Sequence, residues 1–368
     1  MLQVALDAGP LLGPRTGIGL AVDELVSAFA RRDDVALTRY ACSFRGRLLP
    51  GMRRLPIPAA AAHRAWARSE YPRLDRFLRP AEIVHGTNYV VPPSRLPRIV
   101  SVYDCWFLRE AAAGRAVGAA VTRAGRVLRR ATDAGAIVHA SSHATADAIG
   151  ELLGTERVHV IHLAALPART APVEQAAPIA ELADAPYVLA LGTLERRKNL
   201  PRLVAAFDEL AARHGDVRLV LAGADSDDRD AVNDAIDALR PAARARVALS
   251  GRIDDHAKAW LLSHAAVLAY PSLDEGFGFP LLEAMQNDVP VVASRAGSIP
   301  EVAGDAALLV DHDDVEALTA ALDSALTDSV VREQLIAAGH RRLDVFSWDT
   351  TAAQLVDLYR NVIEQASR

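Results

Sequence analysis

The chain has 368 residues, of which 51% are hydrophobic, and its formal net charge at pH 7 is −5. This length and composition predict a globular protein with two domains, each with a complete core. Two cysteines are too few for a disulfide framework, and the sequence contains no run of about 18 uncharged apolar residues that could cross a membrane.

The first residues, Met1–Asp7, have the pattern of a strand and lack the cationic flank and cleavage site of a secretory signal. We therefore expect a cytoplasmic protein, or one that is peripheral on the inner face of a membrane. Residues 1–170 hold 23 arginines and 14 acidic residues, whereas the remainder of the chain is acidic. The basic part predicts contact with an anionic acceptor or an acidic lipid surface, unless its arginines only cover solvated helix faces. The arginines concerned are Arg53, Arg54, Arg64, Arg68, Arg73, Arg76 and Arg79.

Short apolar runs alternate with helix-like segments along the chain, which predicts parallel sheets with crossover helices. The pattern occurs twice, on either side of a proline-spaced segment at 167–178 that has no helix or strand periodicity. The first set of expected strands is 3–6, 35–38, 83–85, 99–102 and 136–139, and the second is 187–191, 218–223, 247–251, 266–270 and 290–294. We predict two doubly wound α/β domains, at 1–170 and 186–348, joined by a linker at 171–185 and followed by a helix at 349–368.

A glycine-rich loop, Gly13–Gly19, follows the first strand and precedes a helix expected at 21–29. Gly17 and Gly19 would let this loop close over the phosphates of a ligand. The same glycines also suit a tight strand-to-helix turn that binds nothing, and both interpretations stay open.

Histidines follow two strands of the first domain, at the edge where open parallel sheets bind ligands. His85 is a candidate to donate a hydrogen bond to a sugar or an acceptor, or else it is satisfied by nearby backbone. For His139 we favour a structural role, next to Ser141 or Ser142 as the N-cap of the following helix.

The strand at 187–191 runs through Gly192-Thr-Leu-Glu-Arg-Arg-Lys-Asn199 into a helix that begins near Pro201. Lys198 is one of only two lysines in the chain, against 39 arginines. A compact ammonium at a strand-to-helix turn suits a phosphate oxygen, and Arg197 is a second candidate for the same role.

Two glutamates, Glu275 and Glu283, stand eight positions apart, with a Gly-Phe-Gly turn and a helix start between them. Gly276 and Gly278 let the backbone approach a ligand, and Pro280 suits a first helical turn whose free amides could face a diphosphate. Because phosphates repel carboxylates, each glutamate should instead accept hydrogen bonds from sugar hydroxyls. The segment therefore predicts a sugar nucleotide as ligand.

These segments together resemble glycosyltransferase family 4, the retaining, nucleotide-sugar-dependent enzymes with the GT-B fold. The resemblance covers most of the chain and implies two Rossmann-like domains that face a central cleft, with the acceptor on the first domain and the donor on the second. It also implies that the last helix crosses back to the first domain. The blocks that carry it, in the family's order, are 192–199, 270–285, 289–294, 297–302 and 304–311.

By position, the resemblance implies that Lys198 binds the donor diphosphate, Glu283 the ribose and Glu275 the donor sugar. The Phe277-Gly278 backbone would lie against the sugar and phosphates, and family members carry a similar loop where Gly17 and Gly19 stand. We expect catalytic roles for Glu275, Lys198, Arg197, Tyr103, Asp104 and His85, and donor contacts from Gly17, Gly19, Gly192, Thr193, Phe277, Gly278, Phe279 and Glu283.

Two positions depart from the family pattern. Tyr103 stands where family members usually carry the histidine of a His-Asp pair, and a phenol does not titrate near neutral pH. Either the histidine's role is not proton transfer, which we favour, or activity is weak, or Asp104 has taken over acceptor activation. At Asn287-Asp288 the family prefers glycine, but Asn and Asp tolerate the left-handed conformation, so the turn should survive.

We predict a hexosyltransferase that moves mannose or a similar hexose from a GDP- or UDP-linked donor to a glycan or lipid-linked acceptor, without a metal, a further cofactor or a nucleic acid. No nucleophilic carboxylate can be identified on the acceptor side, so we expect the front-face route that the resemblance implies, with the departing phosphate taking the proton. A sugar-nucleotide epimerase or phosphorylase on a related scaffold, and a non-catalytic sugar-nucleotide-binding protein, remain alternatives. A dinucleotide dehydrogenase is disfavoured because no Gly-x-Gly-x-x-Gly motif follows a strand.

Overall fold

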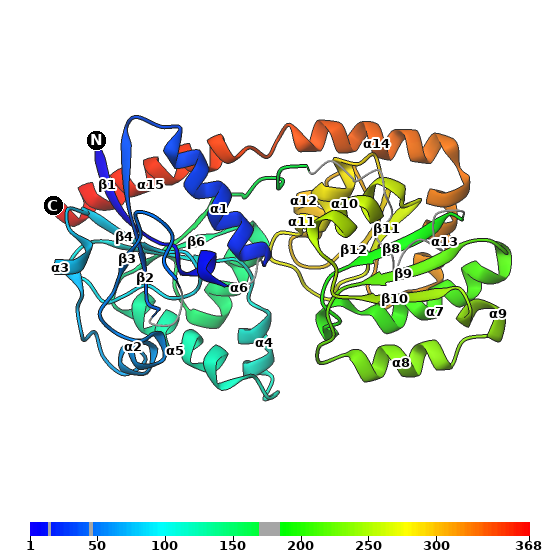
Figure 1. The fold of residues 1–368 in the computed structure, drawn as a ribbon, viewed down its shortest axis with the longest axis horizontal. Coiled ribbons are helices and arrows are strands. Elements are labelled where there is room, and N and C mark those ends of the chain that lie inside the picture. The colour runs from blue at the N-terminus through cyan, green and yellow to red at the C-terminus, as the bar shows by residue number, and fades with distance from the viewer. Residues whose placement is uncertain (14–15, 44–46, 169–184) are drawn as a thin grey trace. The chain divides into compact units, whose positions relative to one another are not determined.

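The structure is a computed structural model that describes residues 1–13, 16–43, 47–168 and 185–368. These residues form two compact units (Figure 1). The first unit comprises Met1–Ala164 together with Phe346–Arg368, and the second comprises Ala165–Val345. The predicted linker at 171–185 lies outside the described residues except for residue 185.

The first unit is built on a seven-stranded sheet in which every pair of neighbours is parallel. The chain extends from β1 in one direction to β2 and β3 and in the other to β4 and beyond, so the strand order reverses between β1 and β4. Such a reversal creates a crevice at the carboxyl ends of the strands, where doubly wound sheets bind ligands. The strands, in the order β3-β2-β1-β4-β5-β6-β7, are Arg53–Arg54, Val35–Ala41, Leu2–Asp7, Ile83–Gly86, Arg98–Val102, Ile137–Ala140 and Val158–Val160.

Helices cover the faces of this sheet, and their ends follow ordinary capping chemistry. Thr16 caps α1 by accepting a hydrogen bond from the Gly19 amide, and Ser142 caps α6 by accepting one from Thr145, as predicted for this serine pair. Helix α6 ends at Gly154, whose φ of 68° closes it in the left-handed conformation. The helical segments are η1 (Gly9–Leu12), α1 (Gly17–Ala30), α2 (Ala59–Trp66), α3 (Asp75–Leu78), α4 (Trp106–Ala112), α5 (Ala119–Asp133) and α6 (His143–Leu153).

The last helix of the chain, α15 (Trp348–Ser367), belongs to the first unit and packs along α1 (Figure 1). The rings of Phe29 and Tyr359 stack with their centroids 6.1 Å apart, and Thr351 donates to the carbonyl of His162. Leu355 and Leu358 are buried, as the apolar stripe of this helix requires.

The second unit contains a six-stranded parallel sheet, which again reverses direction, here between β8 and β11. The strands, in the order β10-β9-β8-β11-β12-β13, are Val247–Gly251, Arg218–Ala222, Tyr187–Leu191, Val267–Tyr270, Val291–Ser294 and Leu308–Val310. The helical segments are η3 (Arg196–Lys198), α7 (Leu200–Arg213), α8 (Arg229–Asp237), α9 (Pro241–Arg244), α10 (Asp255–His264), α11 (Phe279–Met285), α12 (Ile299–Ala303), α13 (Val315–Thr327) and α14 (Ser329–Leu343).

The predicted fold class, two doubly wound parallel sheets, is confirmed, and all ten expected strands are present within a few residues of their predicted bounds. The predicted start of the first helix, at residue 21, was wrong, because α1 begins at Gly17, directly after its N-cap Thr16. The turn at Asn287-Asp288 survives as predicted, with Asp288 in the left-handed conformation at φ 56°.

Candidate functional site

The loop after β8 is shaped around the side chain of Lys198. Gly192 has a φ of 137°, and a Cβ there would come within 3.0 Å of the Lys198 Cε. A short helix, η3, carries Lys198 and ends at Asn199, which adopts φ 55° and caps α7. Asn199 Nδ2 donates to the carbonyls of Pro271 (3.1 Å) and His312 (2.8 Å), so it ties the loop to two other segments of the second unit. Thr193, a predicted donor contact, is half-buried in this loop.

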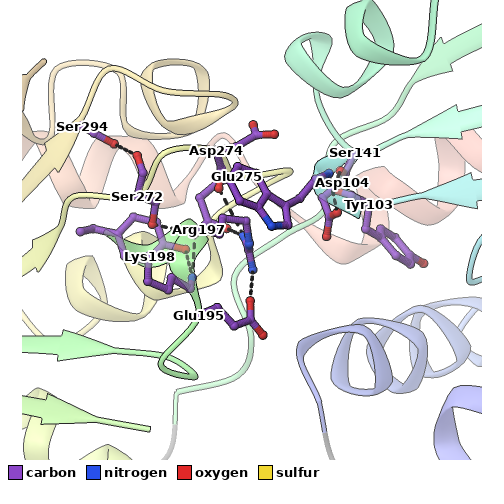
Figure 2. Close-up of polar contacts among 12 residues, drawn as sticks. Tyr103, Asp104, Ser141, Glu195, Arg197, Lys198, Ser272, Asp274, Glu275 and Ser294 are labelled. Carbon is purple, nitrogen blue, oxygen red and sulfur yellow. Dashed lines mark hydrogen bonds and ion pairs between the residues drawn. The ribbon is translucent and has the colours of Figure 1, made fainter. Parts of the chain in front are cut away.

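Two cationic side chains of η3 converge on one buried carboxylate (Figure 2). Glu275 is 6% exposed, and its Oε1 accepts from Lys198 Nζ at 2.7 Å and from Ser272 Oγ at 2.8 Å. Arg197 Nη1 donates to its other oxygen, Oε2. Lys198 Nζ also donates to the hydroxyl of Tyr270 at 3.0 Å and is 8% exposed as a residue.

The charges at this cluster keep Glu275 ionised. Burial by itself raises the pKa of Glu275, but Lys198, Arg197 and the hydrogen bonds outweigh it and lower the pKa to about 2. Burial lowers the pKa of Lys198, while the carboxylate of Glu275 opposes that shift. Glu195 approaches the outer side of Arg197 at 3.5 Å. The cluster therefore contains two cations and two carboxylates, of which Lys198 and Glu275 are buried and Arg197 and Glu195 are half-buried.

The turn that presents Glu275 requires glycine at two positions. Gly278 has a φ of 98°, and α11 begins directly after it with Pro280 in its first turn, as predicted. A Cβ at Gly297 would come within 2.5 Å of Asp274 Oδ1 and of the Glu275 carbonyl, so Gly297 allows the two segments to touch. The rings of Phe277 and Phe279, two predicted donor contacts, meet edge to face at 5.4 Å; Phe277 is buried and Phe279 half-buried.

The second predicted glutamate pairs with the other lysine of the chain. Glu283 lies on α11, is 8% exposed, and accepts from Lys258 Nζ of α10 at 2.6 Å. The two lysines thus pair with the two glutamates, Lys198 with Glu275 and Lys258 with Glu283. Neither Lys258 nor Ser272 was predicted from the sequence to belong to the site. The rarity of lysine in this chain is the signal that could have found Lys258.

The structure does not leave the ring of His85 free for a ligand. This residue is fully buried at the end of β4, and its Nδ1 and Nε2 lie 2.6 Å from Tyr359 Oη and 2.8 Å from Ser101 Oγ. The ring therefore has structural partners, as one of the two interpretations of His85 expected. These partners are side chains, whereas that interpretation expected backbone groups. Contact with a ligand would require one of these hydrogen bonds to break.

Tyr103 and Asp104 follow β5 and belong to the first unit. Tyr103 is 7% exposed, burial raises the pKa of its phenol, and its carbonyl accepts a hydrogen bond from Ser141 (Figure 2). Asp104 is half-buried, and its Oδ1 accepts from the amide of Trp106 at the start of α4.

The two glycines predicted to contact the donor lie in the first turn of α1. Gly19 is buried, and a Cβ there would come within 3.0 Å of the carbonyl of Pro10, so close packing against η1 explains this glycine without a ligand. Gly17 is exposed.

Several of the arginines that make the first unit basic gather around one concavity. It measures about 900 Å³, and its lining includes Arg73, Arg76, Arg79 and Arg95 together with Glu70 and Asp75. Glu70 pairs with Arg98, and Asp75 accepts hydrogen bonds from Ser94 and the Arg95 amide, so the acids at this concavity have other partners.

Within the ranges that the structure describes, no cluster of three or more His, Cys, Asp or Glu side chains is arranged to hold a metal ion. None of the helices in those ranges combines the length and the apolarity that crossing a bilayer requires.

Comparison with known proteins identifies relatives for both halves of the chain. The sequence model of a family described as glycosyl transferases group 1 matches residues 174–342. The O-antigen chain mannosyltransferase B of Escherichia coli is 29% identical over 98% of this chain and 100% of its own. A phosphatidyl-myo-inositol mannosyltransferase of Mycolicibacterium smegmatis is 31% identical over 58% of each chain, and an MMP α-(1→4)-mannosyltransferase of Mycolicibacterium hassiacum is 43% identical over 32% of this chain and 30% of its own.

Solved structures support the same fold. The sucrose-phosphate synthase of Thermosynechococcus elongatus superimposes with a TM-score of 0.71 at 20% identity, over 99% of this chain and 100% of the other. WaaG, a glycosyltransferase involved in lipopolysaccharide biosynthesis, gives a TM-score of 0.70 at 18% identity, over 97% and 99%. At such identities the likeness establishes the fold alone.

Proposed function

Because the chain belongs to the group 1 glycosyl transferases, family 4, we propose that it moves a hexose from a nucleotide-diphosphate sugar to a glycan or lipid-linked acceptor. We propose further that it retains the configuration of the anomeric carbon. The three relatives described above all carry the name mannosyltransferase, which makes mannose the first candidate for the sugar. GDP and UDP are both candidates for the nucleotide.

The observation that carries this proposal is the convergence of Lys198 and Arg197 on Glu275. Glu275 holds both cations in fixed positions before any donor arrives, and preorganised charge is the most effective way to stabilise a leaving group. Lys198 and Arg197 bring two cationic donors together on one carboxylate at the loop after β8, which suits the charge of a diphosphate. Glu275 already accepts hydrogen bonds from Arg197, Lys198 and Ser272, and a hydroxyl of the donor sugar would join these donors or displace one of them.

The proposed chemistry needs no protein nucleophile. The acceptor hydroxyl attacks the anomeric carbon from the face that the diphosphate leaves; the glycosidic bond forms, the bond between the anomeric carbon and the phosphate oxygen breaks, and the hydroxyl proton passes to that oxygen. Lys198 and Arg197 stabilise the charge that develops on the departing diphosphate. Tyr103, whose phenol stays protonated because burial raises its pKa, serves as a hydrogen-bond partner and not as a base.

Glu283 is proposed to accept hydrogen bonds from the ribose hydroxyls of the donor. Its pairing with Lys258 keeps the carboxylate in one position on α11, so Lys258 acts as a positioning residue.

A panel of nucleotide sugars tests the proposal in the full chain. A ligand at 100 times its dissociation constant adds about 2.7 kcal/mol to the free energy of unfolding, so the true donor should raise the melting temperature clearly. Incubation of that donor with mannoside acceptors should then yield a glycoside with the anomeric configuration of the donor. If no nucleotide sugar raises the melting temperature, or if the donor alone is isomerised, the proposal fails.

We also propose that the arginine-lined concavity of the first unit contacts the acidic headgroups of a membrane on the cytoplasmic side. Co-sedimentation with vesicles of phosphatidylglycerol should exceed that with phosphatidylcholine and should decline as salt rises. Replacing Arg73, Arg76 and Arg79 together with glutamine should abolish the difference, and equal co-sedimentation of the parent with both lipids would contradict the proposal.

A further inference from the structure

A separate cavity lies within the first unit, at the carboxyl ends of β1, β2 and β4. Its volume is about 380 Å³, inside the range of roughly 300–1,000 Å³ that small-molecule pockets occupy. The strand order reverses between β1 and β4, so the cavity stands where a doubly wound sheet is expected to bind a ligand.

The polar groups of this cavity offer hydrogen-bond acceptors. Asp7, the last residue of β1, lines it; its Oδ1 accepts from the Gly9 amide at 2.9 Å, and within the described residues it has no ion-pair partner. Asn88 lines the cavity too, and its Oδ1 is buried without a hydrogen-bond partner among those residues. A buried acceptor without a partner requires an explanation, and a donor on a bound ligand would supply one. Sugar hydroxyls are donors of this kind.

The remaining wall suits the apolar face of a sugar ring and does not suit a phosphate. Trp66, which is 2% exposed, and Val90 contribute apolar surface. Among the described residues, neither lysine nor arginine lines the cavity; His63 does, but burial and the charge of Arg123 lower the pKa of His63, so it is neutral near pH 7. A phosphate placed beside Asp7 would be repelled by the carboxylate.

We propose that this cavity is the acceptor subsite and that it takes a neutral, unphosphorylated sugar residue whose hydroxyls donate to Asp7 and Asn88. The inference rests on the proposed function, and it adds the chemical class of the acceptor end and the residues that bind it. Any anionic or lipid portion of the acceptor lies outside this cavity.

The ionisation of Asp7 supports the same assignment. Burial raises the pKa of Asp7 to about 7, against the opposing effect of the Gly9 amide. A hydroxyl donor from a ligand would stabilise the charged form, which the described residues stabilise through that single hydrogen bond.

Saturation-transfer NMR on the full chain tests the proposal directly. The probes are the methyl α-glycosides of mannose, glucose, galactose and N-acetylglucosamine, each compared with the 6-phosphate of the same sugar. At least one neutral glycoside should give signals in the parent, and those signals should fall at least fivefold in both Asp7→Asn and Asn88→Ala. The sugar phosphates should bind more weakly. The matched control is Asp33→Asn, an exposed aspartate of the same unit outside the cavity, which should behave as the parent does.

Three results would overturn the proposal: no neutral glycoside binds, the signals persist in both cavity variants, or they disappear in Glu275→Gln and not in Asp7→Asn. The last result would place the glycoside in the donor site. A sugar phosphate that binds more tightly than its neutral counterpart would likewise overturn it. The melting-temperature shift by the donor should be unchanged in the cavity variants, so a missing shift in the parent counts against the proposed function and not against the cavity.

Discussion

The hydroxyl of Tyr359 lies 2.6 Å from Nδ1 of His85, although the two residues are 274 positions apart. This contact begins a buried chain of hydrogen bonds. The next two join His85 Nε2 to Ser101 Oγ and Ser101 Oγ to His139 Nδ1, and each has a length of 2.8 Å. His139 Nε2 lies 2.9 Å from the carbonyl of Ile161, which can only accept. That end fixes the direction: His139 donates to Ile161, Ser101 to His139, His85 to Ser101, and Tyr359 to His85.

Acid should therefore destabilise the first unit through these two histidines. Burial lowers the pKa of His85 well below its usual value and that of His139 to about 4, whereas both have values near 6.5 in the unfolded chain. Below about pH 6.5 the unfolded state binds more protons, so the free energy of unfolding falls as the pH drops toward 4, by on the order of 3 kcal/mol for His139. The pKa of Asp7 is raised, so Asp7 has the opposite effect on stability. The free energy of unfolding is therefore measured at pH 7.5 and at pH 5 in both the parent and His139→Gln, because the contribution of Asp7 is the same in the two proteins and cancels in their difference. Equal losses of stability in the two proteins would contradict the prediction.

Replacing Lys198 with alanine should reduce transfer by roughly 100-fold, because the departing diphosphate loses a preorganised charge. The measurement is kcat with the donor that raises the melting temperature. Arg196→Ala, a change in the same short helix η3 at a residue outside the proposed site, is the control and should stay within about threefold of the parent. If Lys198→Ala also stays within about threefold, the electrostatic account of the reaction is wrong.

Glu275→Gln should destabilise the second unit, because the buried Lys198 and the half-buried Arg197 lose a counter-charge; the typical cost of breaking a buried ion pair is about 3–5 kcal/mol. Since the folded pKa of Glu275 is lowered to about 2, its contribution is present above its unfolded value near 4.5 and is lost as the pH falls from 4.5 toward 2. Chemical denaturation at pH 7 and at pH 3.5 should show a smaller gap between the parent and the variant at the lower pH. A gap that is the same at both values would argue against an ionised Glu275.

Lys258→Met should weaken donor binding and leave kcat almost unchanged, because Glu283 loses the partner that holds it in position. Hydrogen bonds to charged groups contribute about 1.5–3 kcal/mol, so the dissociation constant of the donor should rise at least tenfold. Titration calorimetry measures this rise, and Arg252→Met, in the loop between β10 and α10, serves as the control. A fall in kcat with unchanged donor affinity would show that Glu283 does not act through binding.

Tyr103→Phe should lower kcat about fivefold, the value of one hydrogen bond of about 1 kcal/mol, and should not change the shape of the pH–rate profile. The phenol does not titrate near neutral pH, so its removal takes away a hydrogen bond and no proton transfer. Tyr103→His, which introduces the residue that the family usually carries here, is the comparison. A pH profile that loses one limb in Tyr103→Phe would assign proton transfer to this position.

The sequence predicted the sheets because their central strands are short apolar runs that are buried on both faces, such as 83–86 and 187–191. The strands that it missed, β3, β7 and β13, are only two or three residues long and incompletely buried, so they leave little periodicity to detect. The start of α1 was missed because glycines, which are unfavourable in helices, occupy positions 17 and 19 of its first turn. The cap by Thr16 stabilises this turn.

The candidate site was predictable in its residue types and not in its pairings. The rarity of lysine and the spacing of the two glutamates pointed to Lys198, Glu275 and Glu283. No sequence pattern indicated that each lysine would pair with one glutamate, because Lys258 reaches Glu283 only when α10 packs beside α11. The hydrogen bonds of His85 with Tyr359 were equally hidden, since they depend on where the last helix docks.

The two hydrogen bonds of Asn199 have a consequence for how tightly a donor can be held. One side-chain amide joins the loop after β8 to the segments that follow β11 and β13, so three loops are immobilised together. These loops lose their conformational entropy when the chain folds and not when a ligand binds. Because the binding surface is already ordered, binding has a smaller entropic penalty. Loss of the Asn199 side-chain amide would make all three segments more mobile at once. The proposed affinity for a nucleotide sugar would then fall, although no group proposed to contact the sugar nucleotide would be removed.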